Sequence, residues 1–406
     1  MRLINTETLT LKQFYDTDLP KYAILSHCWG DEEVSFSDLS RNVALEGAGL
    51  TKIRQSCRLA VNDGYEWIWI DTCCIDKSSS AELSEAINSM FRWYQNAEIC
   101  YAYISDAKGD EPESFQHSRW FTRGWTLQEL LAPRQVKFFD TDWKMIGDRD
   151  QVTGEIAAAT GINFIDPFCG QSWTDGWTGI CIAKKMSWVA KRETSRPEDI
   201  AYCLLGLFDI NMPLLYGEGA MKAFRRLQLA ILNTTDDESI FAWGPLKDTA
   251  DTKDADHHPT EAKETPAGRL TGLLAPSPKH FAAMIQNEYH ERSERAPWMM
   301  TNKGLQLTLG PGSWTTVKGV SSSECISVLF SAAVFEEDRW HRPVVFLVRD
   351  RESAPWSRLE QNPLSPYSSR SRSRILRAQI KCRRYTHYWP KWLEKFGKSK
   401  TIYVEV

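Results

Sequence analysis

Three short stretches of the chain carry residue types that can do chemistry. They are the turn Ser26–Asp31 (SHCWGD), the loop residues Asp71, Asp76 and Lys77, and the pair Trp125 and Glu129. Residues four apart on a helix lie one above the other, so we expect the indole of Trp125 beside the carboxylate of Glu129. A carboxylate fixed in this way can stabilise a positive charge that develops in a transition state.

The first two stretches also contain residue types that bind metals or act as nucleophiles. They contribute His27, Cys28, Asp71, Cys73, Cys74 and Asp76. These side chains lack the Cys-x-x-Cys and His-x-x-x-His spacings of metal sites, and neighbouring residues on a strand point to opposite faces. For the same reason, His27 is poorly placed to activate Cys28 as a nucleophile. We therefore expect no metal at this edge, and we rank a cysteine nucleophile as a minor alternative.

Each stretch also has a purely structural interpretation. The turn at 26–30 is equally typical of a structural turn with a buried tryptophan, and the polar residues at 71–77 are typical of helix caps and turns. Glu129 can form an ion pair with Arg119 or Arg123 instead of facing a ligand, and the tryptophan four residues before it can belong to the core. The residues alone leave these alternatives open.

Alternating strand and helix patterns must position these stretches. Apolar runs predict strands at 22–26, 66–71, 99–104 and 136–139, and helical spacing predicts helices at 51–62, 79–97 and 118–132. Ser79 and Glu82 have the spacing of a capping box, and Pro133 ends the third helix. The alternation predicts an α/β fold with a parallel sheet and helices on both faces. Ligands bind beyond the carboxyl ends of such strands, at 26–30 and 71–78.

The remaining chain divides by composition. We expect a first domain at 1–150, a helical annex at 151–245, a flexible linker or loop at 246–268 and a β-rich C-terminal region at 269–406. The annex contains predicted helices at 197–208, with Ser195 as a cap, and at 218–232. Strands are predicted at 305–309, 325–335, 343–348 and 401–406.

The composition limits which binding partners and which cellular compartment we expect for the protein. A formal net charge of −4 over 406 residues gives no general attraction to nucleic acid, and the basic run from Arg370 to Arg384 is typical of a solvated loop. No segment approaches the ~18 apolar residues of a membrane span. Ten scattered cysteines without a secretory signal predict reduced thiols and a cytoplasmic location.

Four ordered blocks resemble those of fungal heterokaryon incompatibility (HET) domains. They are Tyr22–Gly30 (YAILSHCWG), Trp69–Lys77 (WIDTCCIDK), Ala81–Ala97 (AELSEAINSMFRWYQNA) and Ser118–Pro133 (SRWFTRGWTLQELLAP). A further stretch, Met186–Trp243, resembles the segment that often follows a HET domain in fungal incompatibility proteins. The resemblance implies self/non-self recognition and programmed cell death, a form of fungal innate immunity.

HET domains are similar to TIR domains, many of which cleave NAD. This resemblance implies a TIR/flavodoxin-like parallel sheet and makes Glu129 the catalytic carboxylate of a Trp-x-x-x-Glu pattern, with Trp125 beside it. The nucleotide would be held by Ser26, His27, Cys28, Trp29 and Gly30, with Trp29 as a stacking surface. The loop with Asp71, Asp76 and Lys77 would correspond to the TIR loop that gates the site and mediates assembly.

The bond between nicotinamide and ribose needs no strong nucleophile, because nicotinamide leaves as a neutral molecule. Two unit charges ~4 Å apart interact by about 4 kcal/mol at an effective dielectric near 20, so one well-placed glutamate matters. We therefore expect an NAD-hydrolysing HET effector. The alternative is a non-enzymatic module that triggers cell death through self-association and an unknown protein partner.

Overall fold

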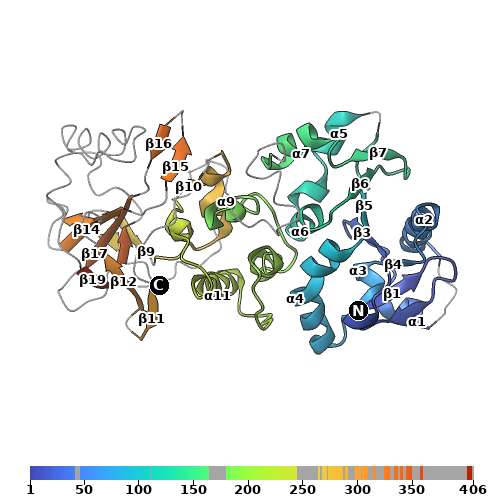
Figure 1. Cartoon of the computed structure of the whole chain (residues 1–406), viewed down its shortest axis with the longest axis horizontal. Coiled ribbons are helices and arrows are strands. Elements are labelled where there is room, and N and C mark those ends of the chain that lie inside the picture. The colour runs from blue at the N-terminus through green and yellow to red at the C-terminus, as the bar shows by residue number, and fades with distance from the viewer. Residues whose placement is uncertain are drawn as a thin grey trace. The chain divides into compact units, whose positions relative to one another are not determined.

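The computed structural model describes residues 1–41, 46–109, 111–163 and 180–244 continuously, and separate segments between 264 and 404. The chain forms two compact units. Unit 1 comprises Met1–Ile180 and Lys191–Ile231, and unit 2 comprises Cys181–Ala190 and Leu232–Val406. Each unit is described by itself below (Figure 1).

Unit 1 is built on a seven-stranded sheet with the order β2-β1-β4-β3-β5-β6-β7. Its strands are β1 (Arg2–Asn5), β2 (Leu11–Gln13), β3 (Ala23–His27), β4 (Trp67–Trp69), β5 (Ile99–Tyr103), β6 (Val136–Phe139) and β7 (Met145–Asp148). The central strands β4, β3, β5 and β6 are parallel, as the sequence predicts. An α/β fold is therefore confirmed.

The expectation of a wholly parallel sheet is wrong at both edges. Strands β1, β2 and β7 pair antiparallel with their neighbours, so the sheet is mixed. Leu3 and Ile4 of β1 are fully buried, whereas β2 has no buried residue. A strand of three or four residues is too short to show a period of two, which is why sequence patterns did not predict β1 and β2.

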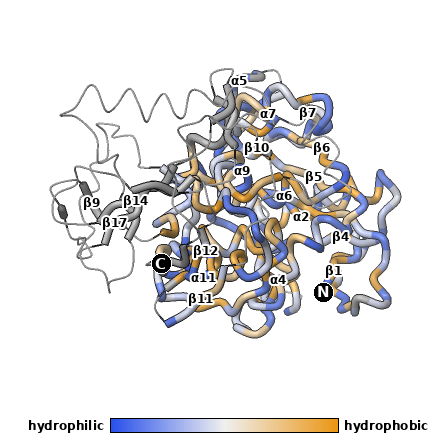
Figure 2. The backbone as a smooth tube through the Cα atoms, turned by 60° about the vertical axis from the view of Figure 1, so that its left-hand side comes forward, coloured by the Kyte–Doolittle hydropathy of each residue, from blue (hydrophilic) through white to orange (hydrophobic). Residues whose placement is uncertain are grey.

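Helices cover both faces of the sheet. Helix α2 (Ala48–Asn62) lies on one side, and α4 (Ser80–Asn96) and α6 (Thr126–Leu131) lie on the other (Figure 1). The cap of α4 is confirmed, because the Ser79 side chain accepts a hydrogen bond from the Glu82 backbone N–H. The apolar stripe of α4 is buried, and the central strands of the sheet are strongly apolar (Figure 2).

The chain reverses its direction of travel through the sheet at β3. From β3 it passes to β4 on one side, and it then crosses over β3 to reach β5 on the other. Ser26 pairs with Ala102 and His27 with Tyr103, so the carboxyl ends of β3 and β5 lie side by side. Ligands bind at such a topological switch point in open α/β sheets.

The predicted helix at 118–132 is broken. Residues Arg119–Thr122 form the short 3-10 helix η2, Arg123 is extended, and α6 begins after Trp125. The break has a specific cause: the Gly124 N–H donates to the Glu193 carbonyl at 2.8 Å, and the Glu193 N–H donates to the Thr122 carbonyl at 2.7 Å. This short parallel bridge uses backbone groups that a continuous helix would need.

The segment 191–231 of unit 1 differs from the prediction in one helix. Instead of a helix at 197–208, the chain forms α10 (Asp199–Tyr202) and η3 (Gly206–Phe208). Ser195 does not cap α10, whose N-cap residue is Glu198, and its hydroxyl instead accepts a hydrogen bond from Arg123. A Cβ at Gly206 would lie 2.0 Å from the Phe91 Cβ, so the chain passes α4 too closely for a regular helix with side chains here. Helix α11 (Ala220–Leu232) agrees with the prediction.

The other described helices are short. They are η1 (Asp16–Asp18), α1 (Phe36–Ser40), α3 (Asp71–Cys74), α5 (Pro112–Gln116), α7 (Thr153–Thr160), α9 (Ile182–Ser187), η4 (Glu238–Phe241) and η5 (Pro278–Gln286). In the part of the chain that the structure describes, no helix has the length and apolar character needed to cross a membrane.

The described segments of unit 2 beyond 264 are mostly strands. They are β8 (Glu264–Thr265), β9 (Gly268–Thr271), β10 (Tyr289–His290), β11 (Met299–Thr301), β12 (Gly304–Leu309), β13 (Trp314–Thr316), β14 (Glu324–Leu329), β15 (Ala333–Glu336), β16 (Arg339–His341), β17 (Val344–Arg349), β18 (Ser357–Leu359) and β19 (Lys400–Val404). The strand predicted at 325–335 is divided between β14 and β15. Most of the predicted linker, and the basic run Arg370–Arg384, lie outside the described residues.

Candidate functional site

Glu129 lies in the first turn of α6, against the carboxyl end of β3. The Ser26 hydroxyl donates a hydrogen bond of 2.5 Å to Glu129 Oε2. Ser26 in turn accepts a hydrogen bond of 2.8 Å from the indole N–H of Trp120. The Tyr94 hydroxyl of α4 also interacts with the Glu129 carboxyl. We call Ser26, Tyr94, Trp120 and Glu129 the Glu129 network.

Burial decides the charge of Glu129. The residue is only 7% exposed, and burial raises its pKa to about 8, with the negative charge of Asp71 acting in the same direction. The hydrogen bond from Ser26, the interaction with Tyr94 and the charge of Arg123 oppose this rise. The carboxyl group therefore carries a proton for most of the time at neutral pH in the unliganded chain.

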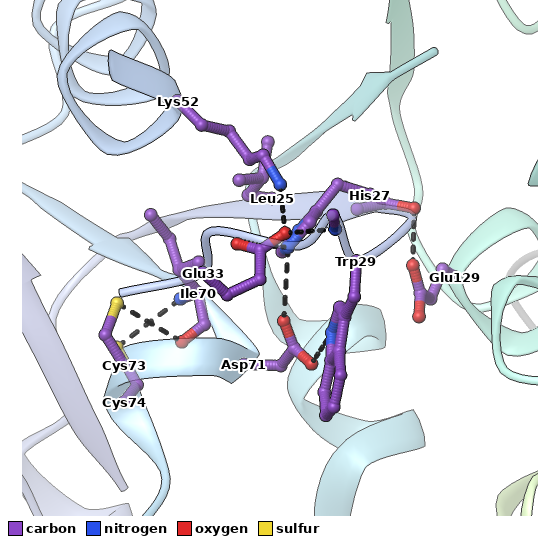
Figure 3. A network of polar contacts seen from close by, with 12 residues as sticks. Leu25, His27, Trp29, Glu33, Lys52, Ile70, Asp71, Cys73, Cys74 and Glu129 are labelled. Carbon is purple, nitrogen blue, oxygen red and sulfur yellow. Dashed lines mark hydrogen bonds and ion pairs between the residues drawn. The ribbon is translucent and has the colours of Figure 1, made fainter. Parts of the chain in front are cut away.

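A second set of polar residues surrounds His27. The Asp71 carboxylate accepts a hydrogen bond of 2.8 Å from the Trp29 indole, and its other oxygen lies 3.8 Å from His27 Nε2. Glu33 lies 3.7 Å from the same nitrogen and accepts from Lys52. We call His27, Trp29, Glu33, Lys52 and Asp71 the His27 network (Figure 3).

The two networks meet the end of β3 from opposite sides. Ser26 and His27 are neighbours on the strand, and successive side chains of a strand point to opposite faces. Figure 3 shows Glu129 on one side of the strand end, and Glu33 and Asp71 on the other. Ser26 and His27 thus take part in different networks, and the binding of one nucleotide by both residues stays a prediction. Charge still links the networks, because Asp71 raises the pKa of Glu129.

Cys28 belongs to the Glu129 side of the turn but is not activated. Burial, followed by the charge of Glu129, raises the pKa of its thiol to about 11. A reactive cysteine needs a lowered pKa, so that the thiolate is populated at neutral pH. The environment of Cys28 acts in the opposite direction and argues against a cysteine nucleophile.

The remaining predicted site residues have separate roles. The Gly30 N–H donates to Glu33 at 2.7 Å and so supports the His27 network. The Lys77 ammonium lies 3.7 Å from the ring centroid of Trp29, which is 49% exposed. Asp76 accepts hydrogen bonds from the backbone N–H and the hydroxyl of Ser78, the ordinary turn chemistry that its sequence position also suggested.

Two indoles lie near the start of α6, and their N–H groups have different partners. The Trp125 N–H donates to Asp199 at 3.1 Å, whereas the Trp120 N–H reaches Ser26 and through it Glu129. The helix break at Arg123 separates Trp120 from α6, whereas Trp125, at the N-cap of α6, still precedes Glu129 by one helical turn. The Trp125 N–H is therefore tied to α10, the Trp120 N–H reaches Glu129 only through Ser26, and the role of Trp125 beside the carboxyl group stays a prediction.

Sequence patterns did not single out four members of the two networks, nor one buried arginine close to them. These are Glu33, Lys52, Tyr94, Trp120 and the buried Arg192. Trp120 lies within the block Ser118–Pro133 that carries the HET resemblance, so a weak signal existed there. Tyr94 lies on the buried stripe of α4, where an aromatic residue is typical of core packing.

Within the described residues, no group of three or more His, Cys, Asp or Glu side chains is arranged to hold a metal ion. The two networks offer hydrogen-bond donors, three carboxyl groups (Glu33, Asp71 and Glu129) and one exposed indole. These groups suit a polar organic ligand that carries a positive charge, because a nearby cation would favour the ionised form of Glu129, which burial and the charge of Asp71 disfavour.

Comparison with known proteins identifies the class. Residues 22–117 match the model of the heterokaryon incompatibility protein (HET) family, and residues 222–300 match a domain of unknown function (DUF8212). The chain therefore contains a HET domain. Ser26, His27 and Asp71 lie inside the matched range, and Glu129 lies beyond its end.

One curated relative is similar over a long stretch. The vegetative incompatibility protein HET-E-1 of Podospora anserina is 46% identical to this chain over 221 residues, and the two are homologous. The match covers 52% of this chain but only 16% of HET-E-1. No solved structure matches the chain.

Proposed function

We propose that this chain is a HET-domain effector of fungal self/non-self recognition and programmed cell death that hydrolyses NAD at the nicotinamide–ribose bond. The observation that carries the proposal is the hydrogen bond between Ser26 and Glu129 at the carboxyl end of β3. It holds a buried carboxyl group at the switch point of the sheet, where ligands of α/β folds bind.

The sheet topology supports a TIR-like interpretation of the domain. Numbered among themselves, the four parallel strands have the order 2-1-3-4, which is the start of the flavodoxin-like order. The carboxyl group of Glu129 comes from the helix after the third of these strands. This is the element in which the resemblance to TIR domains locates the catalytic glutamate.

Substrate charge provides the switch that ionises Glu129. The oxidised nicotinamide ring carries a positive charge, and at ~4 Å it favours the ionised carboxylate by about 4 kcal/mol, or roughly 3 pKa units. Burial raises the pKa of Glu129 from 4.5 to about 8, so the two effects are of similar size. Binding of the substrate therefore ionises Glu129, whose carboxylate the cleavage requires. Without substrate, Glu129 stays neutral.

The reaction follows from that anion. The C1′–N bond breaks, and its electron pair leaves with the neutral nicotinamide. The Glu129 carboxylate stabilises the resulting cation at C1′, and water then adds there and loses a proton. The Ser26 hydroxyl keeps the carboxylate oriented, because its own acceptor site is occupied by Trp120. In this proposal, Trp29 offers a stacking surface for the nucleotide, and Lys77 neutralises diphosphate charge.

The test is an incubation of the purified full-length chain with NAD, with nicotinamide release measured by chromatography. We expect release by the wild type and none by Glu129→Gln, which keeps the shape but cannot ionise. Glu85→Gln, at an exposed position on α4, is the matched control and should retain the wild-type rate. The assay is run on dilute, concentrated and surface-clustered protein, since assembly is a common requirement of TIR-like enzymes.

A second function is favoured by the charge state of Glu129. A buried, protonated glutamate that accepts a hydrogen bond from Ser26 also suits a structural role in a non-enzymatic signalling module. Such a module would act through self-association and a protein partner. Absence of nicotinamide release from every sample, including clustered wild-type protein, would favour the module over the enzyme.

A further inference from the structure

Residues 192–199 of unit 1 bind the start of the Glu129 helix, and we call them the strap. Glu193 forms the parallel bridge with Arg123, and Asp199 accepts the hydrogen bond from Trp125. A Cβ at Gly124 would lie 2.5 Å from the Thr194 methyl group, so the two backbones approach closely. The strap thus holds residues 122–126, immediately before Glu129, through backbone and side-chain contacts.

Arg192 is the buried part of the strap. Only 3% of the residue is exposed, and its Nη1 donates to the Arg123 carbonyl at 2.8 Å and to the Thr126 hydroxyl at 3.0 Å. Thr126 is the first residue of α6, and Arg123 directly precedes the turn that leads into it. The guanidinium group therefore holds the two residues on either side of the turn that leads into α6.

The charge of Arg192 also reaches the Glu129 carboxyl group. Burial lowers the pKa of Arg192 to about 10, and the charges of Cys203, Glu129 and Cys28 oppose that lowering. The guanidinium group is therefore still charged at neutral pH. It is a buried positive charge held against the first turn of the helix that carries Glu129, and the charge of Glu129 interacts with it.

We infer that Arg192 is a positioning residue for Glu129: it anchors the first turn of α6 through Arg123 and Thr126 and supplies a buried positive charge that favours the Glu129 anion. Its catalytic consequence rests on the proposed NAD hydrolysis, whereas its effect on the ionisation of Glu129 does not. Residue 192 lies far beyond the range 22–117 that matches the HET family, so that match does not include it.

Several other groups face Glu129 and must be considered in any pH measurement. From the elements packed around it, these are Ser26 and Cys28 (end of β3), Asp71 (α3), Tyr94 (α4), Cys100 (β5), and Arg123 (before α6). Burial raises the pKa of Cys28, Tyr94 and Cys100, so these groups stay neutral below pH 8. Arg123 is then the positive charge of this set that acts on Glu129, opposed by Asp71, and Arg192 also interacts with the charge of Glu129.

The decisive experiment measures the ionisation of Glu129 directly, in the full chain and without NAD. Protein labelled with carbon-13 in its glutamate carboxyl groups is titrated by infrared spectroscopy, and the spectrum of Glu129→Gln is subtracted to isolate Glu129. In Arg192→Met we expect the pKa of Glu129 to rise by about one unit. Arg192→Lys keeps a charge and a nitrogen that can make both hydrogen bonds, so it should remain close to wild type.

Arg149 provides the matched control. It is also buried, and its guanidinium group donates to the carbonyls of Leu130, Pro133 and Arg134 at the other end of α6. Arg149→Met should destabilise the protein without raising the pKa of Glu129 by a comparable amount. An unchanged Glu129 pKa in Arg192→Met would overturn the inference. If that variant does not fold, Arg192→Gln, which retains an amide donor, is titrated in its place.

Nicotinamide release then tests the catalytic consequence. The rising limb of the pH–rate profile should move up by about one unit in Arg192→Met and return toward the wild-type position in Arg192→Lys. A wild type that releases no nicotinamide refutes the proposed function alone, because the infrared titration still tests Arg192. If Arg192→Met raises the pKa of Glu129 as expected but does not move the pH–rate profile, the catalytic role of Arg192 is refuted and the proposed NAD hydrolysis is not.

Discussion

The Ser26 hydroxyl donates a 2.5 Å hydrogen bond to the carboxyl group of Glu129, a residue 103 positions further along the chain. This bond joins the first parallel strand to the helix that follows the third. Ser26 lies within the part of the chain that matches the HET family, and Glu129 lies outside it. A domain limited to residues 22–117 would therefore contain the donor of the bond but not its acceptor.

The raised pKa of Glu129 predicts a pH-dependent stability. The folded state binds this proton more tightly than the unfolded state, because the pKa rises from 4.5 to about 8 on folding. The resulting stabilisation is complete below pH ~4.5 and is lost as the pH rises through ~8. Glu129→Gln cannot ionise, so between pH 5 and pH 9 its stability should improve relative to wild type by on the order of 3 kcal/mol.

Urea denaturation of the full chain at both pH values measures this difference. All other titrating groups are shared by the two proteins, so their effects cancel in the comparison. Glu85→Gln, at an exposed position, should show no such change. An equal stability gap between wild type and Glu129→Gln at pH 5 and pH 9 would contradict the assignment of a raised pKa to Glu129.

Loss of the Ser26 hydroxyl should lower the free energy of unfolding more than loss of another buried serine hydroxyl. Ser26→Ala removes the donor to Glu129 and leaves the buried Trp120 N–H without its acceptor. We expect destabilisation of about 1–3 kcal/mol, measured by urea denaturation. The control is Ser56→Ala in α2, where an equally buried hydroxyl donates only to the Ile53 carbonyl of the same helix. Similar losses in both variants would show that the Glu129 network adds nothing specific.

The two tryptophans near Glu129 should behave differently. Trp120→Phe removes the hydrogen bond that orients Ser26. We expect this change to destabilise the transition state of the proposed NAD cleavage by about 1.4 kcal/mol, which makes nicotinamide release tenfold slower. Trp125→Phe removes only the bond to Asp199, so it should lower the melting temperature and keep the rate within about threefold of wild type. The opposite ranking would make Trp125 rather than Trp120 the indole on which the proposed reaction depends.

The chain just before α6 packs closely against the strap, so a substitution there should lower the stability and a second substitution should restore it. Gly124→Ala would bring a methyl group to 2.5 Å from the Thr194 Cγ2, with destabilisation of about 1–3 kcal/mol. Thr194→Ser removes that methyl group and keeps the hydroxyl that donates to the Arg196 carbonyl at 2.7 Å. The double variant should therefore regain much of the lost stability in thermal unfolding.

Gly154→Ala in α7 is the control for the effect of the substitution itself. Nothing lies within 4 Å of a Cβ at Gly154, so alanine should be neutral or slightly stabilising there. If Gly124→Ala is also neutral, the backbones of α6 and the strap are not in the tight contact described above.

Much of the central fold is predictable from local patterns. The strands at 22–26, 99–104 and 136–139 and the helix at 79–97 are strong signals, because buried parallel strands are continuously apolar and Ser79 caps its helix. The helix break at Arg123 is not predictable in this way. It depends on pairing with Glu193, 70 residues later, and no local pattern reports a partner at that distance.

In the candidate site, too, some features are predictable from the sequence and others depend on tertiary packing. Ser26 and Glu129 carry the right chemistry and the strand order brings them together, so the sequence predicts their proximity. The residues around them are determined by tertiary packing. Which indole reaches Ser26 depends on the helix break, and the pairing of Glu33 with Lys52 depends on how α2 packs against the turn after β3.

The interrupted chain path of unit 1 affects how the protein is made. Its second part begins only at Lys191, after an excursion of the polypeptide into unit 2. During synthesis on the ribosome, the nascent chain exposes β3 and α6 well before Arg192 and the rest of the strap leave the exit tunnel. The Glu129 helix thus acquires its final anchor late in translation, so prematurely terminated products that lack residue 192 cannot assemble this arrangement.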